Sequence, residues 1–121
     1  MAAYRRVVHA ETGRELVPRA RWCDSFGSKL RGFMLQRALA PEEGLVLVQP
    51  AASRVNSAIH MLFVFFDLGV LWVDDAGRVV DQVLARRWRL HYAPRSPARY
   101  VVEAHPDILS RVQVGDRIEF R

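Results

Sequence analysis

The feature that most constrains the fold is an apolar run in the middle of the chain, IHMLFVFFDLGVLWV at residues 59–73. Only two of its side chains, His60 and Asp67, are ionisable. As a helix the run would rise about 22 Å, whereas the hydrocarbon core of a bilayer is about 30 Å thick. It is dense in Phe, Val and Trp, and Gly69 interrupts it, so it is also poor helix material. We therefore expect buried strand in the core of a globular domain and no insertion into a membrane.

A turn signal follows this run. The sequence DDAG at residues 74–77 has the composition of a tight turn, and VVDQV at residues 79–83 resumes in strand-like alternation. We predict that residues 59–80 form a β-hairpin whose turn lies within residues 74–77. A second hairpin is predicted near the start of the chain, where ETGR at residues 11–14 separates two short apolar stretches.

The other elements are short. A helix capped by Asp24 or Ser25 is indicated by apolar residues at helical spacing, which are Phe26, Leu30, Phe33 and Met34. EEGLVLVQP predicts a buried strand that ends at Pro50, and SRVNSAIHM a connector or strand. RYVVEA predicts a strand, HPDILSRV one or two helical turns, and VGDRIEFR a final strand.

These elements add up to about seven or eight strands and one to two short helices. Strands outnumber the helices that could connect parallel neighbours. The expected fold class is therefore a β-rich α+β domain with a small, mostly antiparallel, barrel-like sheet. With 121 residues, half of them hydrophobic, the chain is long enough for a core of its own, and we expect a single domain over residues 1–121.

Cysteine usage and the start of the chain bear on localisation. Cys23 is the single cysteine, so no disulfide can form within the chain. Residues 1–9 have too short an apolar stretch for a signal peptide. We expect a soluble, cytoplasmic protein, in which Cys23 is a small buried hydrophobe.

The net charge of +5 comes from one segment. Residues 86–100, RRWRLHYAPRSPARY, hold five arginines and no acid, whereas the other 106 residues hold thirteen basic and thirteen acidic side chains. Arginine among aromatic residues suits phosphates and stacked bases. The candidate anion-binding residues are Arg86, Arg87, Arg95 and Arg99. The expected partner is an acidic macromolecule or a small anionic ligand; the alternative is a solvated loop with Trp88 anchored in the core.

Motifs of the well-known catalytic classes are missing from the sequence. It contains no HExxH, no GxSxG, no Walker loop and no dinucleotide fingerprint. The four histidines are never three or four residues apart. The sequence therefore assigns no catalytic residue, no metal site and no cofactor.

Several ordered stretches resemble a known family. They are LRGFMLQRALAPEEGLVLV, the run from IHMLFVFF to DDAGRVV, the Trp88-Arg89 pair, and ARYVVEAHPDILSRVQVGDRIEF, together covering about residues 30–120. This order is similar to that of the bacterial and archaeal domain-of-unknown-function family 192. The resemblance implies a compact, barrel-like, β-rich domain and implies no activity.

The sequence departs from the family pattern at one place. The polar triplet Lys-Asn-Thr of the family falls here on the apolar residues 62–64, LFV, while His60 matches an Ile-His subgroup. The candidate ligand-binding residues are His60, Asp67, Arg31, Trp88 and Arg89. His60 could instead be a partly buried histidine with one hydrogen bond, and Arg31 could instead pair with a nearby acid. Asp67 could pair with His60 or with an arginine, or a turn or bulge could point it to solvent.

From these observations we predict a small non-enzymatic binding or structural module. One alternative is a small enzyme that uses His60 with Asp67. A second alternative is an anion or nucleic-acid binder that uses the arginines of residues 86–99.

Overall fold

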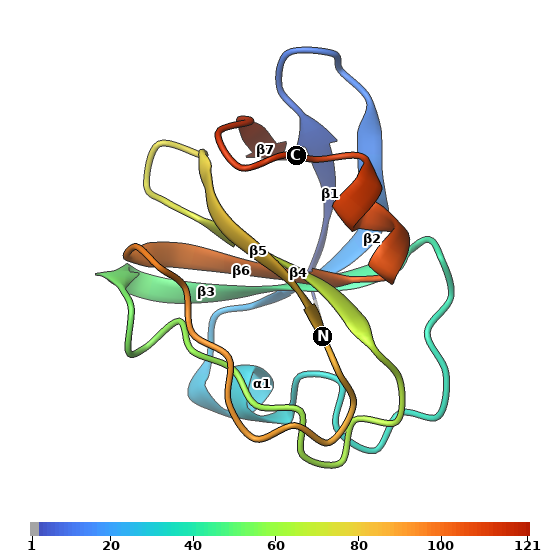
Figure 1. Cartoon of the computed structure of the whole chain (residues 1–121). Helices are drawn as coiled ribbons and strands as arrows, with labels where there is room; N and C mark the ends of the chain where they lie inside the picture. The colour runs from blue at the N-terminus through green and yellow to red at the C-terminus, as the bar shows by residue number, and fades with distance from the viewer. Residues whose placement is uncertain (1–2) are drawn as a thin grey trace.

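A computed structural model of the chain describes residues 3–121, apart from the side chain of Phe26, and shows one curled, seven-stranded sheet in the form of a half-barrel (Figure 1). The sheet order is β5-β4-β6-β3-β2-β1-β7. In chain order the elements are β1 (Tyr4–His9), β2 (Glu15–Cys23), α1 (Phe26–Arg31), β3 (Glu43–Ser53), β4 (Leu68–Val73), β5 (Val79–Ala85), β6 (Ala98–Ala104), the 3₁₀ helix η1 (Pro106–Ser110) and β7 (Ile118–Phe120).

The sheet is antiparallel except at one pair, so the predicted fold class is confirmed. The strands β2 and β3 run parallel, and the connection between them contains α1, because parallel neighbours need a crossover. At one end the two edges of the sheet meet. The amide of Val79 in β5 donates to the carbonyl of Asp116 at 2.9 Å, and the amide of Gly115 donates to the carbonyl of Val79 at 2.8 Å. The half-barrel is thus closed at this end only.

The two faces of the central strands β3, β4 and β6 contact two separate cores, because successive side chains of a strand point to opposite faces. The barrel core lies inside the curl and is covered by η1; it includes Val17, Val46, Leu71, Val102, Ile108 and Ile118. The loop-side core lies on the other face, under α1 and three loops; it includes Cys23, Phe33, Leu45, Leu47, Ile59, Met61 and Val101. Figure 1 shows α1 and these loops gathered on one side of the central strands.

The predicted hairpins are confirmed, with one correction. The strands β1 and β2 join through the turn at residues 10–14, and β4 and β5 through the turn that follows Val73. Residues 59–67, however, are a loop and not strand. Met61 and Val64 are buried while Phe63 is exposed, and Phe63 has a φ of +58°, so the backbone cannot keep the alternation of a strand.

Two further boundaries differ from the sequence-based expectation. The strand β3 continues past Pro50 to Ser53, and the register with β6 shifts between Val48 and Ser53. Such an irregular stretch tolerates a proline, which has no N–H for the ladder. The helix α1 is capped by Ser25, as predicted, but it ends at Arg31, because Gly32 adopts a positive φ. The prediction for HPDILSRV is confirmed by η1.

Candidate functional site

A cavity of about 530 Å³ lies between the loop-side face of the sheet and α1. Its apolar walls come from Phe33 after the helix, Leu47 of β3, and Ile59 and Val64 of the loop before β4. Leu47 points into it because it alternates with Val46 and Val48, which contact the barrel core. The indole Nε1 of Trp72 donates to the carbonyl of Ser57 at 2.8 Å and so fixes the loop that forms one wall. The volume lies in the usual range for small-molecule sites.

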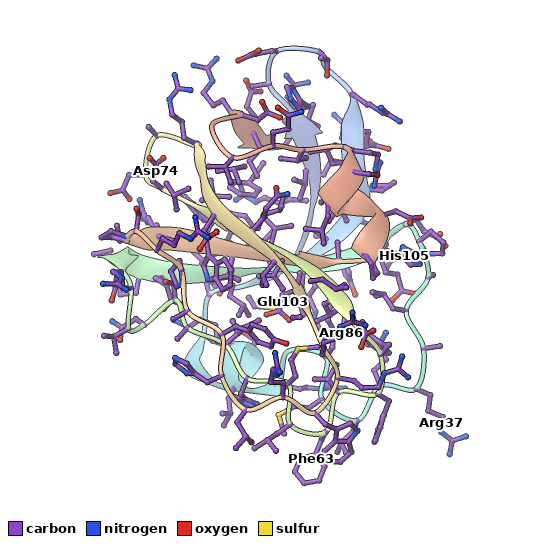
Figure 2. All side chains as sticks on the ribbon, viewed as in Figure 1. Arg37, Phe63, Asp74, Arg86, Glu103 and His105 are labelled. Atoms are coloured by element: carbon purple, nitrogen blue, oxygen red, sulfur yellow. The ribbon has the colours of Figure 1, made fainter. Side chains whose placement is uncertain are left out.

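Glu103 of β6 is the buried acid of this cavity. Its residue is 6% exposed and its neighbours on the adjacent strands are Leu45 and Val70. Within residues 3–121 no hydrogen bond or ion pair to its carboxylate is found. Figure 2 shows Glu103 near the centre of the molecule. Burying a carboxylate without a protein partner is costly, and Glu103 lines the cavity, where a ligand could reach its carboxyl group.

Burial raises the pKa of Glu103 to about 7, and the positive charge of Arg21 opposes this rise. No hydrogen bond joins Arg21 to this carboxylate; the Nη2 of Arg21 donates to the carbonyl of Gly32 at 2.6 Å. Glu103 is therefore divided between its acid and carboxylate forms near neutral pH. In one form it can donate a hydrogen bond, and in the other it can accept a cation.

Basic and polar side chains also line the cavity. Lys29 and Arg31 extend from α1, and the Nζ of Lys29 donates to Oε1 of the buried Gln49 at 3.4 Å. The exposed His60 accepts a hydrogen bond from the amide of Leu62 on Nδ1 at 3.2 Å. The neutral ring then carries its hydrogen on Nε2. The cavity therefore combines an apolar wall, one buried acid and three basic side chains.

The buried Cys23 also belongs to the loop-side core. Burial raises the pKa of its thiol, although the charge of Arg21 opposes this. Its Sγ donates weakly to the carbonyl of Arg21 at 3.7 Å. The thiol thus stays protonated near neutral pH and packs as a small apolar group, as the sequence suggested.

The structure brings together two of the five predicted ligand-binding residues, Arg31 and His60, at the cavity. Asp67 is bound elsewhere: its Oδ1 accepts from the backbone N–H of Arg87 at 2.9 Å and from Nε of Arg87 at 3.2 Å. The hydrogen bond from the Arg87 backbone holds the pKa of Asp67 below its ordinary value. His60 and Asp67 therefore do not form the pair on which the enzymatic alternative rests.

Trp88 and Arg89, the other two candidates, lie in the loop between β5 and β6. The ring of Trp88 packs against Phe63, with centroids 5.3 Å apart, and against Phe65, with centroids 5.7 Å apart. The guanidinium of Arg89 lies 6.0 Å from the ring of Tyr92. The solvated-loop alternative placed Trp88 in the core. Trp88 is instead 45% exposed, so this part of that alternative is wrong.

The arginine-rich segment meets acids from other parts of the chain. Arg86 and Arg87 contact Asp67, Arg99 lies 3.7 Å from Asp75, and the amide of Arg95 donates to Asp81 at 3.0 Å. Counting charges along the sequence missed these contacts, because the acids lie 14 to 24 positions away. Part of the local positive charge is thus compensated.

Glu103 is the residue that the sequence analysis missed. It stands in ARYVVEA, where Val101, Val102 and Ala104 are all buried. A strand without an exposed face has no solvent side for an acid, and this was the available signal. Among residues 3–121 no group of three His, Cys, Asp or Glu side chains is arranged to hold a metal ion, and no helix there is long and apolar enough to cross a bilayer.

Comparison with known proteins gives one consistent family. The DUF192 profile, described as "Uncharacterized ACR, COG1430", matches residues 7–120. A UPF0127 protein of Thermococcus kodakarensis is 34% identical over 116 residues, which span 94% of this chain and 72% of that protein. A UPF0127 protein of Pyrococcus furiosus is 31% identical over 94% of this chain and 97% of its own.

Two crystal structures share the fold. One is of a protein from Sinorhizobium meliloti described as a candidate transcription regulator, with a TM-score of 0.86, 22% identity, and coverage of 98% of this chain and 95% of that one. The other is of a protein of unknown function from Novosphingobium aromaticivorans, with a TM-score of 0.80, 19% identity, and coverage of 98% and 84%. At these identities the likeness shows the fold alone.

Proposed function

The chain belongs to the uncharacterised family DUF192, and on that premise we propose that it is a small-molecule binding module whose ligand occupies the cavity beside Glu103. The observation that supports this most is the buried, unpartnered carboxyl group of Glu103 at a cavity of about 530 Å³. Proteins retain such a group at a cost in stability, and a ligand that supplies the missing partner removes this cost.

The lining of the cavity defines the chemical class of the ligand. An amine is the partner that the Glu103 carboxylate lacks. The apolar walls around Leu47 and Val64 suit a hydrocarbon or aromatic body, and the basic groups of Lys29, Arg31 and His60 suit an acidic group at the other end. We therefore propose a small amphipathic ligand with an amine and an acid, the class to which the apolar amino acids belong.

The arrangement supports binding rather than catalysis. A nucleophile and its base normally lie within hydrogen-bond distance of each other, and the base is oriented by a third group. Within the described chain, Glu103 has no such neighbour, and His60 bonds only to the backbone amide of Leu62. The basic side chains would orient an acidic ligand and need no chemical step.

Calorimetric titration with three related compounds tests this proposal. Phenylalanine carries both charged groups, phenethylamine only the amine, and 3-phenylpropionate only the acid. We expect phenylalanine to bind most tightly, phenethylamine next and phenylpropionate least. At pH 6 most of the Glu103 carboxyl is protonated, so binding of an amine should release a proton, and the measured heat should depend on the buffer.

The variant Glu103→Gln should weaken binding of the two amines by at least about tenfold, the size of one lost charge-assisted hydrogen bond. Glu11→Gln, in the exposed turn between β1 and β2, is the matched control and should bind as the native protein does. The proposal fails if none of the three compounds binds at millimolar concentration, or if the Glu103 variant binds the amines as well as the native protein does.

A further inference from the structure

Four large apolar side chains form an exposed surface at the end of the molecule that carries α1 and the loops. We call this surface the apolar tip; it consists of Leu35, Phe63, Phe65 and Trp88, which are 68%, 44%, 40% and 45% exposed. The rings of Phe63 and Phe65 both pack against Trp88. Single exposed apolar side chains are ordinary, but a contiguous group of this kind marks an interaction surface.

The backbone holds these side chains outward at an energetic cost. Leu35, Phe63 and Trp88 have φ values of +65°, +58° and +67°, and they are the three residues other than glycine with positive φ in residues 3–121. Glycine or asparagine adopts this conformation more readily than bulky side chains do. Three bulky side chains at such positions in one surface indicate that their contacts with a partner matter, because local folding alone favours smaller residues.

Backbone hydrogen bonds join the loops of the tip to each other. The amide of Leu35 donates to the carbonyl of Phe63 at 2.8 Å, and the amide of Trp88 donates to the carbonyl of Met61 at 3.0 Å. The amide of Met61 in turn donates to the carbonyl of Arg89 at 2.8 Å. The apolar tip is therefore a fixed arrangement of three loops, so little ordering is needed when it binds.

The loop segments that form the tip carry an excess of positive charge. Its three loop segments, residues 31–37, 60–66 and 86–91, contain five arginines and no acidic residue. Asp67, the acid that follows the second segment, pairs with Arg86 and Arg87 and compensates part of their charge, so the excess comes mainly from the other three arginines. Figure 2 shows Phe63 and Arg37 both extending outward at the same end of the molecule. An apolar centre with cationic surroundings is complementary to an apolar surface that carries negative charge.

We propose that the apolar tip binds the surface of an anionic lipid bilayer, with Phe63, Phe65, Leu35 and Trp88 inserted at the boundary between headgroups and acyl chains. Trp and other amphipathic or apolar rings favour this boundary, and nearby arginines are attracted by acidic headgroups. Four protruding side chains are few for a stable protein interface, which involves about 20–30 residues on each side. They suffice for reversible binding when apolar insertion and a basic surface act together.

This binding is peripheral, and it is separate from the cavity beside Glu103, which none of the four tip residues lines. It also gives a specific partner to the basic segment, since Arg87 and Arg89 flank Trp88 in the chain. The contribution of apolar insertion to membrane binding should persist at high salt, whereas the contribution of the arginine charges should be screened.

Co-sedimentation with vesicles tests the proposal. We expect the native protein to bind vesicles of phosphatidylcholine with about 30% phosphatidylglycerol at 0.1 M salt, and at least about tenfold more weakly at 1 M salt, where the Debye length falls from about 10 Å to about 3 Å. Vesicles of phosphatidylcholine alone should bind at least tenfold more weakly. Brominated lipids should quench the fluorescence of Trp88, because Trp72 is buried and Trp22 is partly buried.

Two variants separate the tip from the rest of the surface. In the double variant Phe63→Asn, Trp88→Asn, asparagine tolerates the positive φ, so the fold should persist and vesicle binding should fall at least tenfold. Val55→Asn removes an apolar side chain that is 83% exposed outside the tip, and it should bind as the native protein does. A melting curve of each variant establishes that it is folded.

Three outcomes overturn the proposal. One is that the native protein does not sediment with anionic vesicles at 0.1 M salt. Another is equal binding to neutral and anionic vesicles, or equal binding by the double variant. The third is a native dimer in sedimentation velocity that the double variant abolishes, without lipid quenching of Trp88; the partner of the tip is then a second copy of the chain. Quenching by brominated lipids is measured on the native protein, so it tests insertion of Trp88 even if the double variant does not fold.

Discussion

The two cores share the strands β3, β4 and β6, yet they are built differently. The barrel core consists of apolar side chains and is closed at one end by hydrogen bonds between the edges of the sheet. The loop-side core contains a thiol and adjoins a cavity with the buried acid Glu103. Alternate residues of the same strands serve both cores, so the same sheet supports a closed apolar core on one face and a core with an adjoining cavity on the other.

The difference extends to the backbone. Near the closed end the turns use glycine where φ is positive, as at Gly13, Gly77 and Gly115. A Cβ on Gly77 would lie 2.8 Å from the carbonyl oxygen of Ile118, so a larger residue does not fit there. On the loop side Gly32 also has a positive φ, but there the same conformation is taken by Leu35, Phe63 and Trp88 as well, which are not glycines. Strain is thus concentrated on the side with the candidate sites, as is common for functional regions.

The largest expected effect comes from truncating one leucine in each core. Leu71→Ala leaves a void in the barrel core, where Leu71 is 0% exposed, and should lower the free energy of unfolding by about 3–4 kcal/mol. Leu47→Ala removes a side chain that lines an existing cavity, so it should cost about 1–2 kcal/mol less. Urea denaturation of both variants measures the difference. Equal losses would contradict the distinction between a closed and an open core.

The second expected effect is a pH dependence of stability due to Glu103. Its pKa is raised from an ordinary 4.5 to about 7, so the folded state keeps a proton that the unfolded state releases in this range. The native protein should therefore lose stability as the pH rises from about 4.5 to 7, by up to about 3 kcal/mol in total. In Glu103→Gln this loss should be absent. Urea denaturation at pH 4.5, 6 and 8 compares the two proteins.

The informative quantity is how the difference in unfolding free energy between Glu103→Gln and the native protein changes with pH. A buried glutamine has its own desolvation cost, which does not change with pH. The difference in unfolding free energy between the variant and the native protein should therefore grow as the pH rises from about 4.5 to 7. A constant difference from pH 4.5 to 8 would show that Glu103 is ionised and stabilised by a partner in the native fold.

The smallest expected effect concerns Asp116 at the closed end. Its carboxylate accepts hydrogen bonds from the amide of Gln113 at 2.9 Å and from Nε2 of His9 at 3.1 Å, and the first of these does most to lower its pKa below 3.8. Asp116→Asn should cost about 1 kcal/mol at pH 7, because the group is near the surface.

The pH dependence here has the opposite sign to that of Glu103. A lowered pKa means that the stabilisation is present above about 3.8 and is lost as the pH falls below it. The difference between Asp116→Asn and the native protein should therefore shrink in acid. Asp24→Asn, in an exposed position before α1, is the control and should have little effect. A difference that stays the same down to pH 2 would contradict this assignment.

Local signals in the sequence were sufficient for the turns and for the helix cap. Glycine at 13 and 77 marked the two hairpins, and Ser25 marked the start of α1, because each acts through its own backbone neighbourhood. The resemblance to the family was confirmed over residues 7–120. These features depend on residues that are close together in the chain.

The candidate site depends on contacts between residues far apart in the chain, so local sequence patterns predicted less of it. Asp67, isolated in an apolar run, was expected to pair with His60 or with an arginine, or to point to solvent; it pairs with Arg86 and Arg87, about 20 positions away, and the sequence did not show which arginines these would be. Buried and exposed side chains do not alternate along residues 59–67, because this loop packs against the segment after α1 and the β5–β6 loop. Glu103 was visible as an acid in an apolar strand, but its cavity is created by segments from elsewhere.

The closure of the barrel has a consequence for how the chain folds. The C-terminal segment makes both of its contacts with distant parts of the chain: β7 pairs with β1, as Val7 with Phe120, and the residues just before β7 bond to the start of β5. Contacts this far apart in sequence are slow to form. During synthesis, β1 and β5 must wait as open edges until β7 emerges from the ribosome. We expect the nascent chain to be most prone to mispairing with other chains in this interval.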